Sequence, residues 1–252
     1  MWRWIFGLAL WAITAVVSAT EVRVAVAANF LAPLQALAEA FEAAGGPPVR
    51  ISSGATGQHY AQIVNGAPFD VFLAADQARP ARLVGEGLAL RESRFTYAEG
   101  RLVLWARPEA ELPEAGFAGL AGSSPRRLAI ANPRLAPYGA AARAALQASD
   151  QWQALQPRII QGQNVGQALQ YLATGNASHA LVAASYVHRD GRPPGAWVAV
   201  PSHLHAPIRQ DAVQLVNAPA PAAARRFLAF LRGATAAAII ERFGYQAPGA
   251  RQ

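Results

Sequence analysis

Apolar residues change their spacing repeatedly along this chain. In the segment VRVAVAAN, which begins at Val22, apolar and polar positions alternate as in a β-strand, and helical spacing then follows up to the breaker Gly45-Gly46-Pro47-Pro48. The same order of strand and helix recurs at the predicted strands 49–52, 69–74, 101–106, 128–132, 180–187 and 211–216. This alternation predicts an α/β architecture in which mainly parallel sheets are flanked by helices.

A change in this alternation of strands and helices predicts two lobes. The pattern shifts near Gly100 and returns after about Pro207, and two predicted helices, 221–232 and 235–243, end the chain. We therefore expect lobe 1 to comprise residues 20–100 and 207–252, and lobe 2 to comprise residues 101–206. Two lobes joined by crossing segments leave a cleft between them, which is the expected ligand site.

The first residues have a composition of their own. The segment MWRWIFGLALWAITAVVSAT has one Arg near its start, an apolar run, and small residues at Val17, Ser18 and Ala19. This pattern is typical of a secretory signal peptide, residues 1–19, with cleavage after Ala19. An uncleaved anchor is the alternative, although the run is short for a span of about 20 residues. We expect an exported protein with no stable membrane insertion after cleavage.

Composition and the absence of catalytic motifs exclude several classes of function. The chain has no Cys, which excludes disulfides, thiolate metal sites and Cys nucleophiles. Its net charge of +7 is scattered, so we expect no nucleic-acid binding and a surface that steers anions instead. His203 and His205 fit a surface loop better than a zinc site. Since no motif assembles a nucleophile with a base, no catalytic residue is predicted, and an α/β hydrolase or transferase stays the alternative class.

Candidate chemistry gathers at four places where a strand ends, small or hydroxyl-bearing residues follow, and a helix begins. They are Ala28-Asn29, Ala55-Thr56-Gly57, Pro137-Tyr138-Gly139 and Asn164-Val165-Gly166. In open α/β sheets, ligands lie beyond the carboxyl ends of the strands, where the N–H groups of helix N-termini suit an anion. Asn29 and Thr56 add side-chain donors, although each is also an ordinary helix cap.

None of these four places carries a carboxylate. A site made only of donors favours a fully deprotonated dianion, because a protonated phosphate would aim its O–H at groups that cannot accept it. An unpaired buried polar group costs about 1–3 kcal/mol. Sulfate, molybdate and tungstate therefore remain as ligands, and we expect neither a cofactor nor a metal ion bound directly by side chains.

The chain resembles the periplasmic molybdate-binding proteins of molybdate ABC transporters over essentially its whole mature length. The resemblance rests on VAVAANFLAPLQALAEAF, SSGATGQHYAQIVNGAPFDVFLAADQ, AIANPRLAPYGAAARAAL, QNVGQAL and AAAIIERFGY, of which the second segment is the most specific. It implies a type 2 periplasmic-binding-protein fold and a monomeric, non-enzymatic receptor in the periplasm. Such a receptor delivers molybdate or tungstate to an inner-membrane ABC permease. A receptor of the same fold for sulfate or another tetrahedral oxyanion is the alternative.

The resemblance also implies which residues contact the ligand. Carried over by position, the family's contacts fall on Ala28, Asn29, Thr56, Tyr138 and Val165, the last two through the backbone. Many members place a further Tyr near the end of the strand after the Val165 helix, where Ala183 stands in this chain. Asn29 and Tyr138 occur together in one branch of the family, and Tyr138 is therefore expected to supply the missing phenol.

Overall fold

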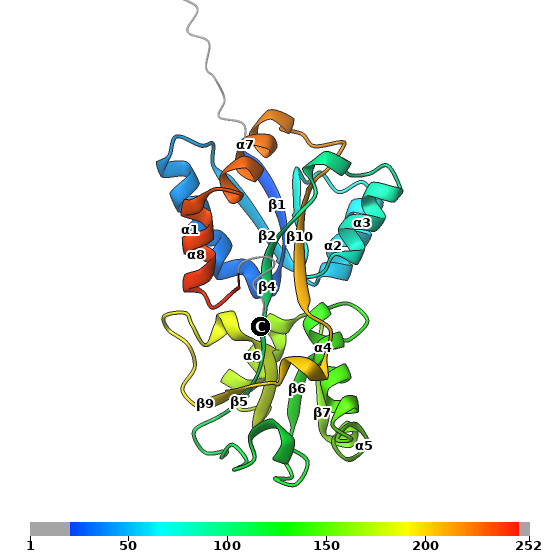
Figure 1. Ribbon diagram of the computed structural model, residues 1–252, viewed down its shortest axis with the longest axis vertical. Coiled ribbons are helices and arrows are strands. Elements are labelled where there is room, and N and C mark those ends of the chain that lie inside the picture. The colour runs from blue at the N-terminus through cyan, green and yellow to red at the C-terminus, as the bar shows by residue number, and fades with distance from the viewer. Residues whose placement is uncertain (1–20, 247–252) are drawn as a thin grey trace, which may run out of the picture.

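The computed structural model describes residues 21–246, and the predicted signal peptide at 1–19 lies outside this range. The described residues form two five-stranded sheets, each flanked by helices (Figure 1). This arrangement confirms the expected α/β fold with two lobes. We call the part that contains the first sheet lobe 1 and the part that contains the second sheet lobe 2.

The sheet of lobe 1 has the strand order β2-β1-β3-β10-β4. Its strands are β1 (Val22–Ala27), β2 (Val49–Gly54), β3 (Val71–Leu73), β4 (Phe95–Gly100) and β10 (Ile208–Gln214). Its helices are α1 (Leu31–Ala43), α2 (Thr56–Val64), α3 (Ala78–Gly85), α7 (Pro221–Leu231) and α8 (Ala234–Arg242). Helices α1, α7 and α8 cover one face of this sheet, and α2 and α3 cover the other (Figure 1).

The sheet of lobe 2 has the strand order β7-β6-β8-β5-β9. Its strands are β5 (Leu102–Ala106), β6 (Leu128–Ala131), β7 (Ile159–Gly162), β8 (His179–Ala183) and β9 (Ala196–Ala199). Its helices are α4 (Pro137–Ala148), α5 (Trp152–Leu155) and α6 (Val165–Ala173). Parallel strands β6, β7 and β8 thus stand beside the pair β5 and β9.

Both sheets are mixed rather than purely parallel. In lobe 1, β10 runs antiparallel to its neighbours β3 and β4, and in lobe 2, β5 runs antiparallel to β8 and β9. The chain enters β5 directly from β4 and enters β10 from β9 with only the 3-10 turn Ser202–Leu204 between them. No crossover helix first returns the chain to the edge of the sheet at which the parallel strands begin. The entering strand therefore runs antiparallel to its neighbours.

The structure corrects several predicted elements. The sequence pattern predicted a strand at 101–106 but did not predict β4, the strand that precedes it and ends at Gly100. The predicted strand 180–187 ends at Ala183, and residues Ala184–Tyr186 form the 3-10 turn η5. Helix α4 begins at Pro137, a position that suits proline because the first helical N–H needs no partner.

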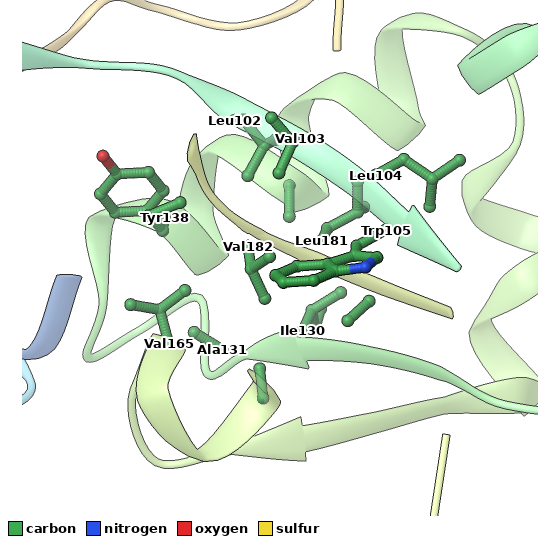
Figure 2. Packing of buried hydrophobic residues seen from close by; sticks show 14 of the residues in the cluster. Leu102, Val103, Leu104, Trp105, Ile130, Ala131, Tyr138, Val165, Leu181 and Val182 are labelled. Atoms are coloured by element: carbon green, nitrogen blue, oxygen red, sulfur yellow. The ribbon is translucent and has the colours of Figure 1, made fainter. Parts of the chain in front are cut away.

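Buried apolar side chains connect the two lobes. A cluster around Trp105 fills lobe 2 and includes Tyr138 and Val165 from the starts of α4 and α6 (Figure 2). The same cluster extends to Ala28 and Ala75 of lobe 1. The N-terminal ends of α4 and α6 therefore pack against lobe 1. Within residues 21–246, no helix combines the length and the apolar character that a membrane crossing requires.

Candidate functional site

The predicted contact residues lie where the two lobes meet. Asn29 is in the 3-10 turn η1 (Ala28–Phe30) that follows β1, Thr56 begins α2, and Tyr138 and Val165 are in the first turns of α4 and α6. All four are buried, with exposed fractions of 3% or less. A Cβ added at Gly166, next to Val165, would lie 3.6 Å from the Cβ of Ala28. The fold thus brings these distant segments together, and their contact with a ligand stays a prediction.

The backbone at three of these positions presents donors. Among residues 21–246, the N–H groups of Thr56, Tyr138 and Val165 donate to no backbone carbonyl. The first N–H groups of a helix have no intrahelical partner, and they carry the partial positive charge of the helix dipole. Three buried helix N-termini at one junction are therefore suited to an anion.

Asn29 lies at the centre of a buried polar network. Its Nδ2 donates to Gln210 Oε1 at 2.8 Å and to the Tyr245 hydroxyl at 2.9 Å. Its backbone carbonyl accepts from the Tyr245 hydroxyl and from Ser185 Oγ, both at 2.8 Å. Both amide hydrogens of Asn29 therefore have protein acceptors in this structure, and a contact of this amide with the ligand stays a prediction.

Gln210 connects Asn29 to Tyr138. Its Nε2 donates to the Tyr138 hydroxyl at 3.4 Å, and its Oε1 accepts from the Tyr97 hydroxyl at 3.2 Å as well as from Asn29. A Cβ at Gly100 would lie 2.0 Å from the Tyr138 hydroxyl oxygen, so only glycine leaves room for this phenol beside the crossing from β4 to β5. The two residues that the resemblance pairs are thus linked through a third.

The phenols of this network are neutral. Burial raises the pKa of Tyr97 and of Tyr138 well above the ordinary value, and it also raises the pKa of Tyr186. Burial raises the pKa of Tyr245 to about 12, against the opposing effect of its hydrogen bonds to Ser185 and Asn29. Near neutral pH these hydroxyls are therefore protonated and bring no negative charge to the junction.

Thr56 and Asn164 both lie at the start of a helix, and their side chains have different roles there. Thr56 is the first helical residue rather than the cap, and its Oγ1 accepts from the N–H of Ala75 at 3.1 Å. The hydroxyl hydrogen of Thr56 is thereby left to donate. Asn164 is the cap of α6, because its side chain accepts from the N–H of Gln167 at 3.0 Å.

Ala183 is fully buried at the end of β8 and places no phenol at the junction. Tyr186 lies three residues further on in η5, and its hydroxyl donates to the carbonyl of Ala28 at 3.0 Å. Sequence reasoning missed this residue, together with Tyr97, Ser185, Gln210 and Tyr245. Gln210 lies in β10, where every residue except Arg209 is buried and apolar and polar residues do not alternate, so local spacing gave no signal for it.

The carboxylates next to site residues in the sequence are paired with arginines. Asp211, which follows Gln210, accepts from Arg94 Nε at 2.7 Å, and Asp76, which follows Ala75, forms an ion pair with Arg79. Within the described range, no group of three or more His, Cys, Asp or Glu residues is placed to hold a metal ion. The charges of Asp76 and Asp211 are therefore balanced by arginines.

Comparisons with known proteins agree on one family. The profile of the bacterial extracellular solute-binding proteins matches residues 22–246. The molybdate-binding protein ModA of Azotobacter vinelandii is 45% identical over 90% of this chain and 90% of its own, and ModA of Rhodobacter capsulatus is 42% identical over 96% and 92%. The solved periplasmic molybdate-binding protein of Azotobacter vinelandii superposes with a TM-score of 0.85 and 40% identity, covering 90% of this chain and 99% of that one.

Proposed function

Because the chain belongs to the bacterial extracellular solute-binding proteins, and among them to the periplasmic molybdate-binding proteins, we propose that it captures molybdate between its two lobes. The identity of 45% to a molybdate-binding protein over 90% of the chain is the observation that carries this proposal. The receptor acts in the periplasm after removal of residues 1–19 and passes the anion to an inner-membrane ABC permease. It works as a monomer, without a cofactor and without enzymatic activity.

Binding replaces the water shell of the anion with protein donors. The backbone N–H groups of Thr56, Tyr138 and Val165 approach from three helix N-termini, and the Thr56 hydroxyl adds a fourth donor. Ala28 and Asn29 complete the proposed set of contacts. Within a buried junction these donors interact strongly with a dianion, because little water remains to screen the charge.

Sulfate is the alternative ligand, since it has the same charge and the same tetrahedral shape. The donor set does not separate the two anions, and the size of the closed site is the property that discriminates between them. Tungstate resembles molybdate in both respects, and we expect it to bind as molybdate does. Protonated phosphate lacks an acceptor among the proposed contacts and is expected to bind weakly.

Titration calorimetry on the mature protein tests this proposal. Separate titrations with molybdate, tungstate, sulfate and phosphate are compared at one ionic strength, because salt screens the attraction of a dianion. We expect tight binding of molybdate and tungstate, and negligible heat from sulfate and phosphate. Preferential binding of sulfate would show that sulfate, and not molybdate, is the ligand. The absence of heat from all four anions would refute oxyanion capture.

A further inference from the structure

Besides the bonds of Ser185, Tyr186 and Gln210 described above, two further hydrogen bonds cross between the lobes beside the predicted site. Arg79 Nη2 in α3 donates to the carbonyl of Arg134 at 3.0 Å, and the N–H of Gly57 in α2 donates to the carbonyl of Leu135 at 2.8 Å. Both donors belong to lobe 1, and both acceptors belong to the loop between β6 and α4 in lobe 2. We call these four residues the cross-cleft contact.

Arg79 is held in place from within lobe 1. The carboxylate of Asp76 accepts from the backbone N–H of Arg79 at 2.9 Å, and it also pairs with the guanidinium. The side chains of Arg79 and Asp76 are 26% and 19% exposed, so water screens this ion pair only in part. Because the guanidinium is already oriented, Arg79 loses little conformational freedom when it meets Arg134.

The accepting loop is ordered as well. The side chain of Asn132 accepts from the N–H of Arg134 at 3.0 Å, and the backbone carbonyl of Asn132 accepts from the N–H groups of Leu135 and Ala136. Helix α4, with Tyr138 in its first turn, begins immediately after this loop. The cross-cleft contact therefore sets the position of one proposed anion donor relative to lobe 1.

Gly57 permits the close approach of the two lobes. A Cβ at this position would lie 3.0 Å from the carbonyl oxygen of Leu135 and 3.1 Å from Arg79 Nη2. Such distances are shorter than ordinary contacts of a methyl group. The absence of a side chain at Gly57 thus lets the guanidinium and the loop carbonyl meet at the N-terminus of α2.

The cross-cleft contact shares a cavity with a segment that connects the lobes, but it is not part of that segment. A cavity of about 490 Å³ has Arg79 and Ala136 in its lining together with Pro207 and Ile208, which lead into β10. When two lobes open about their connecting segments, hydrogen bonds between the lobes can separate while the covalent connections persist. The cross-cleft contact consists of such hydrogen bonds, so it separates when the lobes open.

We propose that Arg79, positioned by Asp76, is a clamp that retains the ligand by holding the two lobes closed. This inference rests on the proposed function, and it adds a residue that does not contact the anion. The clamp forms only once the lobes meet, so it acts on release rather than on capture. Loss of the clamp therefore raises the dissociation rate and leaves the association rate unchanged.

The test compares molybdate kinetics in the parent and in Arg79→Gln by stopped-flow tryptophan fluorescence. We expect dissociation to become about threefold to tenfold faster, the range for one partly exposed hydrogen bond. Association should stay within about twofold of the parent. Asp76→Asn keeps the guanidinium but removes its anchor, and it should accelerate dissociation in the same direction by a smaller factor.

Arg82→Gln is the matched control. Arg82 lies on the next turn of α3, is exposed, and pairs with Glu86 inside lobe 1 at 2.8 Å. Its replacement removes an equal charge without touching lobe 2, so both rates should match the parent. The clamp is refuted if Arg79→Gln dissociates like the parent, if Arg82→Gln dissociates equally fast, or if the change appears in association alone, which would indicate electrostatic steering.

A second measurement separates the clamp from the identity of the ligand. Because the chain has no Cys, Ala61→Cys in α2 and Gln147→Cys in α4 would carry unique spin labels at exposed positions of the two lobes. In ligand-free protein, Arg79→Gln should shift the distribution of distances between the labels to longer values, and Arg82→Gln should not. If the parent bound no molybdate, the proposed function would fail, whereas this shift would still support the clamp and its absence would overturn it.

Discussion

Replacing Asn29 with alanine should lower both the stability of the fold and the affinity for the anion. Asn29 is 1% exposed, and its Nδ2 donates to Gln210 at 2.8 Å and to Tyr245 at 2.9 Å. Alanine removes both of these bonds. The backbone carbonyl at this position still accepts from Ser185 and Tyr245, so the path of the chain through η1 should persist.

The expected cost follows from the count of lost bonds. Two hydrogen bonds at about 0.5–1.5 kcal/mol each give about 1–3 kcal/mol of lost stability. Gln210 Oε1 keeps the donor Tyr97 at 3.2 Å and is not left unpaired, so the middle of this range, about 2 kcal/mol, is appropriate. For a protein of this length, that value corresponds to a decrease in Tm of about 4–8 °C.

Scanning calorimetry without ligand measures the first effect, and titration with molybdate measures the second. Asn65→Ala is the control, since the Asn65 side chain is exposed and donates to the carbonyl of Ala61 within α2. Its stability should stay within about 0.5 kcal/mol of the parent. An unchanged Tm in Asn29→Ala would refute the stabilising network. A lower Tm with unchanged affinity would show that Asn29 supports the fold and does not contact the anion.

Three further predictions concern the same junction. Thr56→Val keeps the shape but removes the hydroxyl, so calorimetric affinity for molybdate should fall about tenfold or more, and parental affinity would exclude a contact through Oγ1. Gly100→Ala places a Cβ 2.0 Å from the Tyr138 hydroxyl oxygen and should lower the free energy of unfolding by about 1–3 kcal/mol. Urea unfolding measures this loss, and an unchanged midpoint would contradict it. Burial raises the pKa of Tyr245 from 10.0 to about 12, so the neutral phenol favours the folded state. This contribution to stability is complete below pH 10 and is lost as the pH rises towards 12. Unfolding free energy measured against pH should fall less steeply across this window in Tyr245→Phe, and an identical slope would argue against the assignment.

Strand β4 shows why pattern reasoning missed part of the fold. Within FTYAEG, Thr96 donates to Asp211 Oδ1 at 2.7 Å, and Glu99 pairs with Arg209 at 3.3 Å. Both partners lie on β10, more than a hundred residues later in the sequence. Polar side chains that find partners across a sheet can occupy a buried strand, and they erase the apolar alternation by which such a strand is detected.

The network around Asn29 escaped prediction for a related reason. Gln210 and Tyr245 are separated from Asn29 by 181 and 216 residues, and no local spacing connects them. Their hydrogen bonds depend on where β10 and the end of the chain cross the junction. The same crossing decided which protein groups accept from the amide of Asn29.

The sequence by itself determined the alternation of strands and helices, the presence of two lobes, and the small or hydroxyl-bearing residues at the starts of α2, α4 and α6. These features are local, because backbone preference and apolar periodicity act over a few residues. Only the tertiary structure decided the direction of β5 and β10, the partners of Asn29, and the meeting of Arg79 with the loop before α4. Those features depend on contacts between segments far apart in the chain, which local patterns do not record.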